Sequence, residues 1–222
     1  MKYQSAFEII GPIMVGPSSS HTAGAVRIGN IAQQLLNEDP VQVTFSLMGS
    51  FAETYEGHGT DLALLAGVLG LSTSDERIPN AKQIAEERQL AYKFTKKNLG
   101  DFHPNTVLVE LQGKTKEVKL LGSSIGGGKV EVQELDDFPL KFSGEKPTLF
   151  FNHTDQKGVI AAISSTLHQH GYNIARLSLE RYKKNGLAIA ICEIDDIVEP
   201  ELLSMLKKEI PIIDEIRLVQ TK

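Results

Sequence analysis

The sequence contains one cysteine, Cys192, in 222 residues. A single cysteine excludes an intrachain disulfide, and one thiolate cannot hold an iron–sulfur cluster or a structural zinc ion. Residues 187–194 around it are almost all apolar, which predicts a buried strand. A free cysteine in such a strand behaves as a small hydrophobic residue, so we do not expect a catalytic thiol.

Clusters of positive charge and long apolar runs are also missing. The chain has 23 Lys and Arg against 28 Asp and Glu, a formal net charge of −5. Its basic residues gather only in pairs such as Lys96-Lys97, whereas nucleic-acid binding requires a basic face, so no nucleic-acid partner is expected. No apolar run approaches the length of a membrane span, and the first residues lack the apolar core of a signal peptide. We therefore expect no membrane contact and a cytoplasmic location.

The apolar share of 41% and the charged share of 23% are ordinary for a globular protein. A chain of this length makes one large domain or two small ones. Residues 136–147 concentrate charge, proline and glycine, which is typical of a linker. The expected division is a first domain at 1–140, a linker at 141–147 and a second domain at 148–222.

The two predicted domains differ in their order of helices and strands. The first is an α+β mixture, with helices at 25–36, 60–69 (entered through Thr60 and Asp61 as capping residues) and 81–87, and strands at 41–47, 105–111, 117–121 and 130–135. The second has the order strand, helix, strand, strand, helix, strand of a ferredoxin-like βαββαβ fold, at 148–151, 158–170, 173–182, 187–194, 199–208 and 212–219.

The run 16–24, Gly-Pro-Ser-Ser-Ser-His-Thr-Ala-Gly, directly precedes the first helix. A turn at a helix start exposes backbone N–H groups and the positive end of the helix dipole, which suits an anionic ligand. The simpler interpretation is a helix capped by Ser20 or Thr22. One cap needs one hydroxyl, so Ser18, Ser19 and His21 favour a ligand site.

Two further runs place a histidine in a turn. Residues 56–61, Glu-Gly-His-Gly-Thr-Asp, hold His58 between glycines that keep its side chain accessible, and a histidine suits proton transfer near neutral pH. A solvated loop histidine without a role is an equally good interpretation. Residues 103–106, His-Pro-Asn-Thr, form either a stiff polar site or a plain turn before a strand.

The glycine-rich run 122–129 is not a phosphate loop, because its glycine spacing is wrong and Val130 follows Lys129. A tight hairpin or a backbone-lined substrate pocket is expected there. His168 and His170 lie on different faces of a predicted helix, and we expect both to be exposed. The histidines and carboxylates form no metal signature, and the chain lacks the nucleophile elbow of a serine hydrolase.

Together, the four runs 16–22, 56–61, 103–106 and 122–128 resemble the beta portion of iron–sulfur-dependent L-serine dehydratases. The tail, with 152–158 in its first turn, resembles an ACT domain. The resemblance covers nearly the whole chain. It implies an allosteric-substrate-binding-like (serine dehydratase beta) domain followed by a ferredoxin-like ACT domain.

The resemblance implies a lyase subunit that deaminates L-serine to pyruvate and ammonia, in amino-acid catabolism and gluconeogenesis. Family members hold a [4Fe-4S] cluster with cysteines of the alpha part. This chain, with Cys192 alone, is therefore expected to carry no metal itself and to depend on the cluster of an alpha subunit. The competing hypothesis is a stand-alone amino-acid sensor without catalysis. A pyridoxal-phosphate enzyme finds no support, since no lysine lies in a Schiff-base setting.

The same resemblance assigns candidate site residues. His58 is the proton-transfer candidate near the active centre, and the other residues expected there are Thr60, His103 and Asn105. Ser18, Ser19, Ser20, His21 and Thr22 are expected as substrate-carboxylate or structural contacts. The first domain also resembles the allosteric substrate-binding domain of some phosphoglycerate dehydrogenases, so these motifs serve the active centre, a regulatory serine site, or both.

The ACT resemblance implies self-association and a ligand loop. ACT domains pair with a second copy and bind amino acids between the copies. Asp155 and Gly158 occupy the ligand-loop position, while Lys157 stands where many ACT domains have proline.

Overall fold

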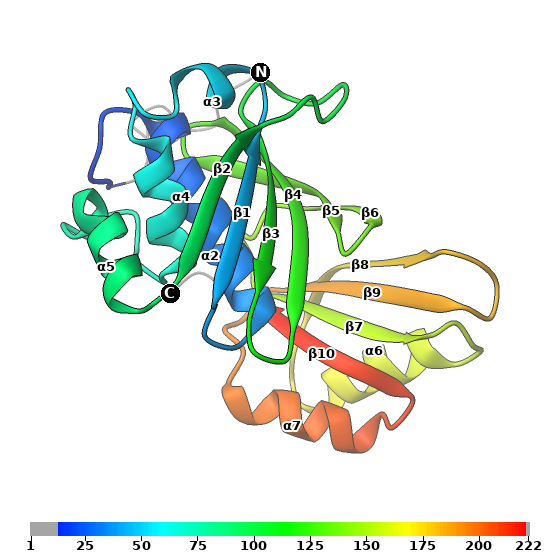
Figure 1. The fold of residues 1–222 in the computed structure, drawn as a ribbon. Helices are drawn as coiled ribbons and strands as arrows, with labels where there is room; N and C mark the ends of the chain where they lie inside the picture. Colours follow the sequence, from blue (N-terminus) through cyan, green and yellow to red (C-terminus); the bar gives the residue numbers. More distant parts are fainter. Residues whose placement is uncertain (1–12, 221–222) are drawn as a thin grey trace. The chain divides into compact units, whose positions relative to one another are not determined.

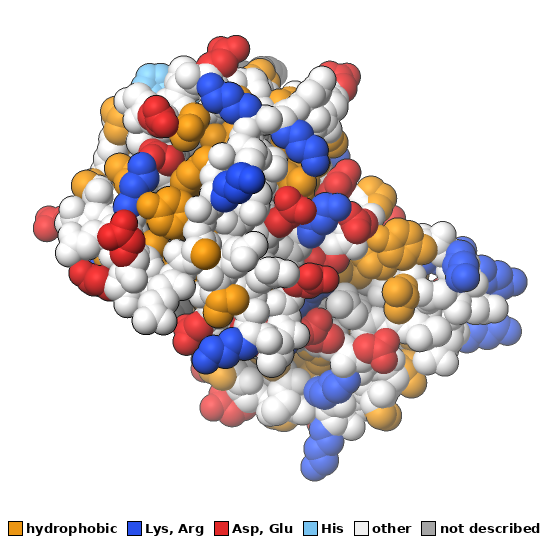
Figure 2. Space-filling view, in the orientation of Figure 1, with side chains coloured by type: hydrophobic (Ala, Val, Ile, Leu, Met, Phe, Trp, Pro, Cys, Tyr) orange, Lys and Arg blue, Asp and Glu red, His pale blue; other side chains and the backbone are white. Residues whose placement is uncertain are grey.

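The computed structural model describes residues 13–220 (Figure 1). The chain divides into two compact units, one ending at Ser143 and the other beginning at Gly144. Within the described range no helix has the length and apolar character needed to cross a membrane. On the face drawn in Figure 2, acidic and basic side chains are interspersed rather than separated by sign.

The first unit is built on a six-stranded sheet with the order β2-β1-β3-β4-β5-β6. Strand β1 pairs in parallel with β2, and every other neighbouring pair is antiparallel. The strands are β1 Gln42–Leu47, β2 Ala91–Lys96, β3 Thr106–Gln112, β4 Glu117–Gly126, β5 Lys129–Leu135 and β6 Phe138–Phe142.

Helices cover one face of this sheet, where α2 and α4 lie behind the strands in Figure 1. Alternate residues of β1, Val43, Phe45 and Leu47, are fully buried, as expected for a strand with one covered face. The helical segments are the π-helical turn η1 Ser19–Ala23, α2 Gly24–Leu36, α3 Gly49–Thr54, α4 Thr60–Val68, the 3-10 turn η2 Ile78–Asn80 and α5 Ala81–Glu87.

The helices α2 and α4 approach each other through glycines. A Cβ added to Gly67 would lie 2.2 Å from the carbonyl oxygen of Val26, and one added to Gly29 would lie 2.5 Å from that of Leu64. Side chains at these positions would force the backbones apart. The glycines therefore set the spacing of the two helices whose first residues carry two of the motifs.

The structure corrects the start of the expected linker. Residues 138–142 form strand β6, which pairs with β5 through a turn of two residues, Asp136 and Asp137. Both aspartates have positive φ, 50° and 66°, and aspartate tolerates this conformation in two-residue hairpin turns. Charge and proline here mark a hairpin at a sheet edge.

Two further elements of the first unit, strand β2 and helix α3, were not predicted.

The second unit has the predicted ferredoxin-like order. Its sheet is antiparallel with the order β10-β7-β9-β8. Buried residues of these strands and of both helices form one core, which includes Phe151, Ile163 and Leu202, and Cys192 is fully buried in it as predicted. The elements are β7 Thr148–Thr154, α6 Val159–Gln169, β8 Ile174–Arg181, β9 Leu187–Ile194, α7 Pro200–Glu209 and β10 Ile213–Val219.

Candidate functional site

The turn before α2 is capped by Ser18, whose Oγ accepts a hydrogen bond from the backbone N–H of His21 at 3.1 Å. The simpler interpretation, in which Ser20 or Thr22 supplies the cap, is wrong, because the helical segment begins earlier, at Ser19. Ser19 and Ser20 are half-buried. The hydroxyl of Thr22 is buried and has no hydrogen-bond partner within the described chain.

His21 lies against a second histidine. Its ring centroid is 4.9 Å from that of His58, with the ring planes at 75°, and 5.4 Å from the ring of Phe51. Its Nε2 atom is 3.1 Å from Ser50 Oγ. Burial and, to a lesser degree, the neighbouring His58 lower the pKa of His21 below the usual value of 6.5. His21 is therefore a neutral imidazole at neutral pH.

The segment between α3 and α4 carries His58 on an exposed turn. Gly59 has a φ of 67° and occupies the N-cap position of α4. Thr60 and Asp61 therefore lie in the first turn of the helix, and the prediction that they cap it is wrong. Thr60 is fully buried, and its hydroxyl has no hydrogen-bond partner among residues 13–220. Asp61 Oδ2 forms an ion pair with Lys82 Nζ at 2.6 Å, so this carboxylate anchors α5 to α4.

The loop before β3 holds His103 in one tautomer when its ring is neutral. The backbone N–H of Asn105 donates to His103 Nδ1 at 3.1 Å, so a neutral ring carries its proton on Nε2. Thr106 Oγ1 donates to the His103 carbonyl at 2.6 Å and contacts Ser123 Oγ at 2.5 Å. The Asn105 Oδ1 atom is buried without a partner in the described residues.

Contacts between the loops bring the four motifs to one end of the sheet. Phe51 follows Ser50 in α3, and both residues contact the His21 ring. The backbone N–H of Phe51 donates to the Pro104 carbonyl at 3.4 Å. The N–H of Ser124 donates to the Asn105 carbonyl at 2.9 Å. Ser124 in turn packs against the start of α2, where a Cβ on Gly24 would lie 2.0 Å from Ser124 Oγ. These contacts connect the motifs around the N-terminus of α2, near α3 at the top of Figure 1.

The glycine-rich run forms the β4–β5 hairpin, which was one of the two predicted alternatives, and strand β4 continues to Gly126 rather than ending at residue 121. Gly126, Gly127 and Gly128 have φ values of 107°, 60° and 75°, a left-handed path that side chains disfavour. Arg27 Nη1 donates to the Gly128 carbonyl at 2.9 Å, which ties the hairpin to α2.

Ser50 was not found by the sequence analysis. It lies in α3, a short helix outside the four motifs, and no spacing in the sequence links it to His21. The glycine before it, Gly49, is the sequence feature that could have indicated a constrained turn. In the structure Gly49 has a φ of 55° and packs against Pro104.

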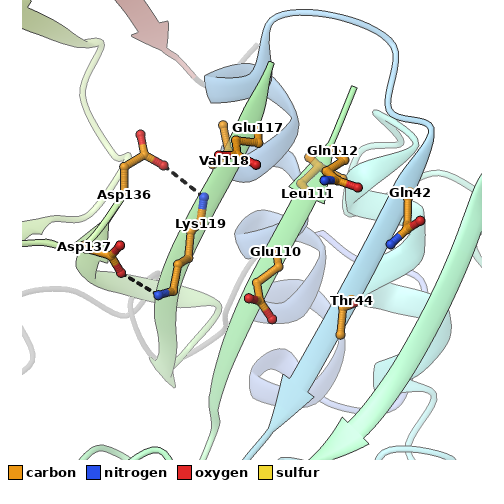
Figure 3. A pocket seen from close by; sticks show the side chains of 10 residues that line it. All are labelled: Gln42, Thr44, Glu110, Leu111, Gln112, Glu117, Val118, Lys119, Asp136 and Asp137. Carbon is orange, nitrogen blue, oxygen red and sulfur yellow. Dashed lines mark hydrogen bonds and ion pairs between the residues drawn. The ribbon is translucent and has the colours of Figure 1, made fainter. Parts of the chain in front are cut away.

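A hollow of about 610 Å³ lies on the sheet of the first unit, away from these motifs (Figure 3). Lys119 Nζ pairs there with Asp137 at 2.5 Å, and the Lys119 backbone N–H donates to Asp136. None of the predicted site residues lines it. Its lining comes from β1, β3, β4 and the β5–β6 turn: Gln42, Thr44, Glu110, Leu111, Gln112, Glu117, Val118, Lys119, Asp136 and Asp137.

In the second unit, the candidate ligand residue Asp155 is engaged by the β8–β9 hairpin. Its Oδ2 accepts from Arg181 Nη1 at 2.9 Å and from the Asn185 backbone N–H at 3.0 Å, and these bonds lower its pKa. Gly158, with a φ of 90°, is the N-cap of α6. His170 contacts Glu209 at 3.1 Å and is half-buried, contrary to the expected exposure, whereas His168 is exposed.

The described residues do not fit an iron–sulfur cluster. Burial raises the pKa of the Cys192 thiol to about 12, while cluster ligands are thiolates. Within residues 13–220 no three His, Cys, Asp or Glu side chains are grouped as a metal site.

Comparison with known proteins gives matches over both units. The serine dehydratase beta chain family matches residues 5–135, and the ACT domain family matches residues 148–211. The "Probable L-serine dehydratase, beta chain" of Bacillus subtilis (strain 168) is 43% identical over 94% of each chain. The "L-serine dehydratase, beta chain" of Peptoniphilus asaccharolyticus is 43% identical over 91% of this chain and 92% of its own. A D-3-phosphoglycerate dehydrogenase of Synechocystis is 26% identical over 83% of this chain, but over only 33% of its own length.

Proposed function

The chain belongs to the serine dehydratase beta-chain family, and we propose that it is the beta subunit of an iron–sulfur L-serine dehydratase. With an alpha subunit, it converts L-serine to pyruvate and ammonia. The observation that carries this proposal is the 43% identity to two proteins named as beta chains, over more than 90% of each. We place the enzyme in the cytoplasm, in amino-acid catabolism and the supply of pyruvate for gluconeogenesis.

The proposed [4Fe-4S] cluster belongs to the alpha subunit. The only thiol of this chain is buried with a raised pKa, so it does not supply a ligand. This chain then contributes binding and proton transfer to a site that the alpha subunit completes. Alone, it is inactive.

We propose that a ring nitrogen of His58 accepts the Cα proton of L-serine. Its imidazole is exposed and lies beside the neutral ring of His21. The electrons of the Cα–H bond form the C=C bond, the β-hydroxyl departs, and the proton taken up by His58 is returned to the departing hydroxide to give water. The resulting aminoacrylate tautomerises to an imine, and hydrolysis of this imine releases ammonia and pyruvate.

The turn at Ser18–Thr22 binds the substrate carboxylate in this proposal. The first N–H groups of a helical segment lack intrahelical acceptors, and the helix dipole favours an anion there. Ser19 and Ser20 supply hydroxyls, while Ser18 caps the turn. His103 and Asn105 border the same end of the sheet, and the Nε2–H of neutral His103 is a donor for a carboxylate or hydroxyl oxygen. The hydroxyls of Thr22 and Thr60 are buried.

The first experiment is an anaerobic purification of the tagged chain from its own cells, assayed for pyruvate from L-serine. Activity together with an iron-containing, cysteine-rich partner supports the proposal. A colourless, inactive preparation that still binds serine favours the stand-alone sensor instead.

Substitution of His58 tests the proton-transfer role in the assembled enzyme. His58→Ala should lower kcat by about 10²- to 10⁴-fold, the usual contribution of a positioned acid or base. His168→Ala, which removes an exposed imidazole in the other unit, is the matched control and should leave kcat unchanged. Unaltered turnover in His58→Ala rules out this role.

We also propose that the ACT unit mediates self-association. Its edge strand β8, the adjoining turn and the first residue of β9 expose Leu179, Tyr182 and Leu187, by 38%, 54% and 63% respectively. Sedimentation of the chain and of a Leu187→Lys variant tests this, because a charge at the interface should shift the population toward monomer.

A further inference from the structure

The hydroxyl of Ser50 is the best-formed polar contact of the His21 ring. Ser50 Oγ lies 3.1 Å from His21 Nε2, which is within hydrogen-bond distance. The other ring nitrogen, Nδ1, is 3.5 Å from Ser18 Oγ, the outer limit for such a bond, and Ser18 Oγ already accepts the His21 backbone N–H at 3.1 Å. Ser50 therefore has the stronger hold on the ring.

The backbone that carries Ser50 is fixed on two sides. Gly49, just before it, packs so closely that a Cβ would lie 2.7 Å from the carbonyl oxygen of Pro104. The Thr54 hydroxyl donates to the Ser50 carbonyl at 2.8 Å. Because the backbone is held against the 103–106 loop and within α3, the Ser50 hydroxyl is presented to His21 in one place.

We infer that Ser50 is a positioning residue of the proposed active site, and that its hydroxyl holds the His21 imidazole in one orientation against His58. The inference rests on the proposed function for its catalytic consequence. Its structural part rests on the contacts of His21 alone. A serine hydroxyl can donate to a ring nitrogen or accept from it, so this bond fixes the orientation of the ring in either neutral tautomer.

The contact with His58 makes this orientation matter. The two rings meet edge to face at 4.9 Å, so a rotation of the His21 ring would place a different edge, with different polarity, against His58. Phe51 packs on His21 from the neighbouring position in α3 and restricts the ring sterically, but it supplies no polar atom. Of the two α3 residues that contact the ring, only Ser50 supplies a polar side-chain atom that favours one ring orientation over the flipped one.

The test compares Ser50→Ala with Ser50→Thr, which keeps the hydroxyl. Ser74→Ala is the matched control, since it removes an exposed serine hydroxyl far from His21 in the sequence. In the assembled enzyme, Ser50→Ala should lower kcat by about tenfold with little change in KM, the size of effect that one neutral hydrogen bond supports. Ser50→Thr should recover most of this loss, and Ser74→Ala should match the unsubstituted enzyme.

An activity-independent measurement uses imidazole ¹H–¹⁵N spectra of the purified full chain. The Nε2 atom of His21 should show the shift of a hydrogen-bonded ring nitrogen in the unsubstituted chain and in Ser50→Thr, and a changed shift in Ser50→Ala. An unchanged His21 spectrum in Ser50→Ala overturns the inference, even if kcat falls. If the His21 spectrum changes but neither His58→Ala nor Ser50→Ala affects turnover, the positioning stands and the proposed catalytic role fails.

Discussion

At the scale of single residues, burial decides which ionisable groups take part in chemistry. Cys192 lies in the core of the ACT unit with a pKa near 12, so the only thiol of the chain is inert. His21 is partly buried beside a second imidazole, and both conditions favour its neutral form. His58 is exposed on a turn between glycines. We therefore assign no chemistry to the buried Cys192 and the proton transfer to the exposed His58.

The neutral His21 predicts a pH dependence of stability. Its pKa in the folded chain lies below the usual 6.5, so between these values the unfolded chain binds more protons and stability rises with pH. The contribution of the neutral ring is present above pH 6.5 and is lost as the pH falls through the lowered pKa. Urea unfolding between about pH 5 and pH 7.5, followed by circular dichroism, should show a shallower pH dependence in His21→Gln.

The control for this measurement is His168→Gln, because His168 is exposed on α6. Its pH dependence should follow that of the unsubstituted chain. A His21→Gln variant whose stability varies with pH as steeply as the unsubstituted chain contradicts the assignment of a lowered pKa to His21.

The single thiol gives a second prediction. Because thiolate is the reactive form, a pKa of about 12 together with full burial should slow reaction with a thiol reagent at neutral pH by at least about a thousandfold relative to the unfolded chain. Stopped labelling before and after unfolding in urea measures this, with no other cysteine to complicate the signal. Rapid stoichiometric labelling of the folded chain would contradict this, because it would show that the face of β9 that carries Cys192 is exposed.

At the scale of elements, the sequence pattern predicts most helices and strands and misses those whose pattern is broken or very short. Helix α2, helix α5 and the six elements of the ACT unit lie within a few residues of their predicted bounds. Strand β6 was assigned to a linker because two aspartates precede it and a proline lies within it. Helix α3 has six residues, too few for periodicity to reveal, and it carries Ser50.

The packing of α2 on α4 predicts that Gly67→Ala destabilises the chain. In an isolated helix alanine is preferred to glycine by about 1 kcal/mol. Here the added Cβ would meet the Val26 carbonyl at 2.2 Å and Gly29 Cα at 2.8 Å, so the helices must separate. A net loss of about 1–3 kcal/mol in the free energy of unfolding is expected.

Gly57→Ala is the matched control for this experiment. Its Cβ would have no neighbour closer than 3.8 Å, and its backbone is not left-handed. Denaturant unfolding of both variants should therefore separate them. If Gly67→Ala is as stable as the control, the close approach of the two helices is incorrect.

At the scale of the whole chain, the site depends on contacts that no local pattern encodes. The sequence reveals four polar runs, each compatible with an ordinary turn or cap. Their meeting around the N-terminus of α2 depends on the pairing of β1 with β3 and of β3 with β4, which brings Phe51, Pro104, Asn105 and Ser124 together. Family resemblance could group the motifs, but only the fold shows that His21 touches His58 and Ser50.

The division into two units predicts that the ACT unit folds alone. Its core residues, from Leu149 to Ile213, all lie within 144–222 and come from its own helices and strands. A chain of residues 144–222 should therefore unfold cooperatively and protect Cys192 from thiol reagents as the full chain does. Residues 155–222 are the control, because they lack β7, which lies between β10 and β9 in the sheet. Without this strand the edge strand β10 loses the strand it pairs with and β9 keeps only β8, so the shorter chain should label rapidly. Rapid labelling of 144–222 as well would show that the ACT core needs the first unit to form.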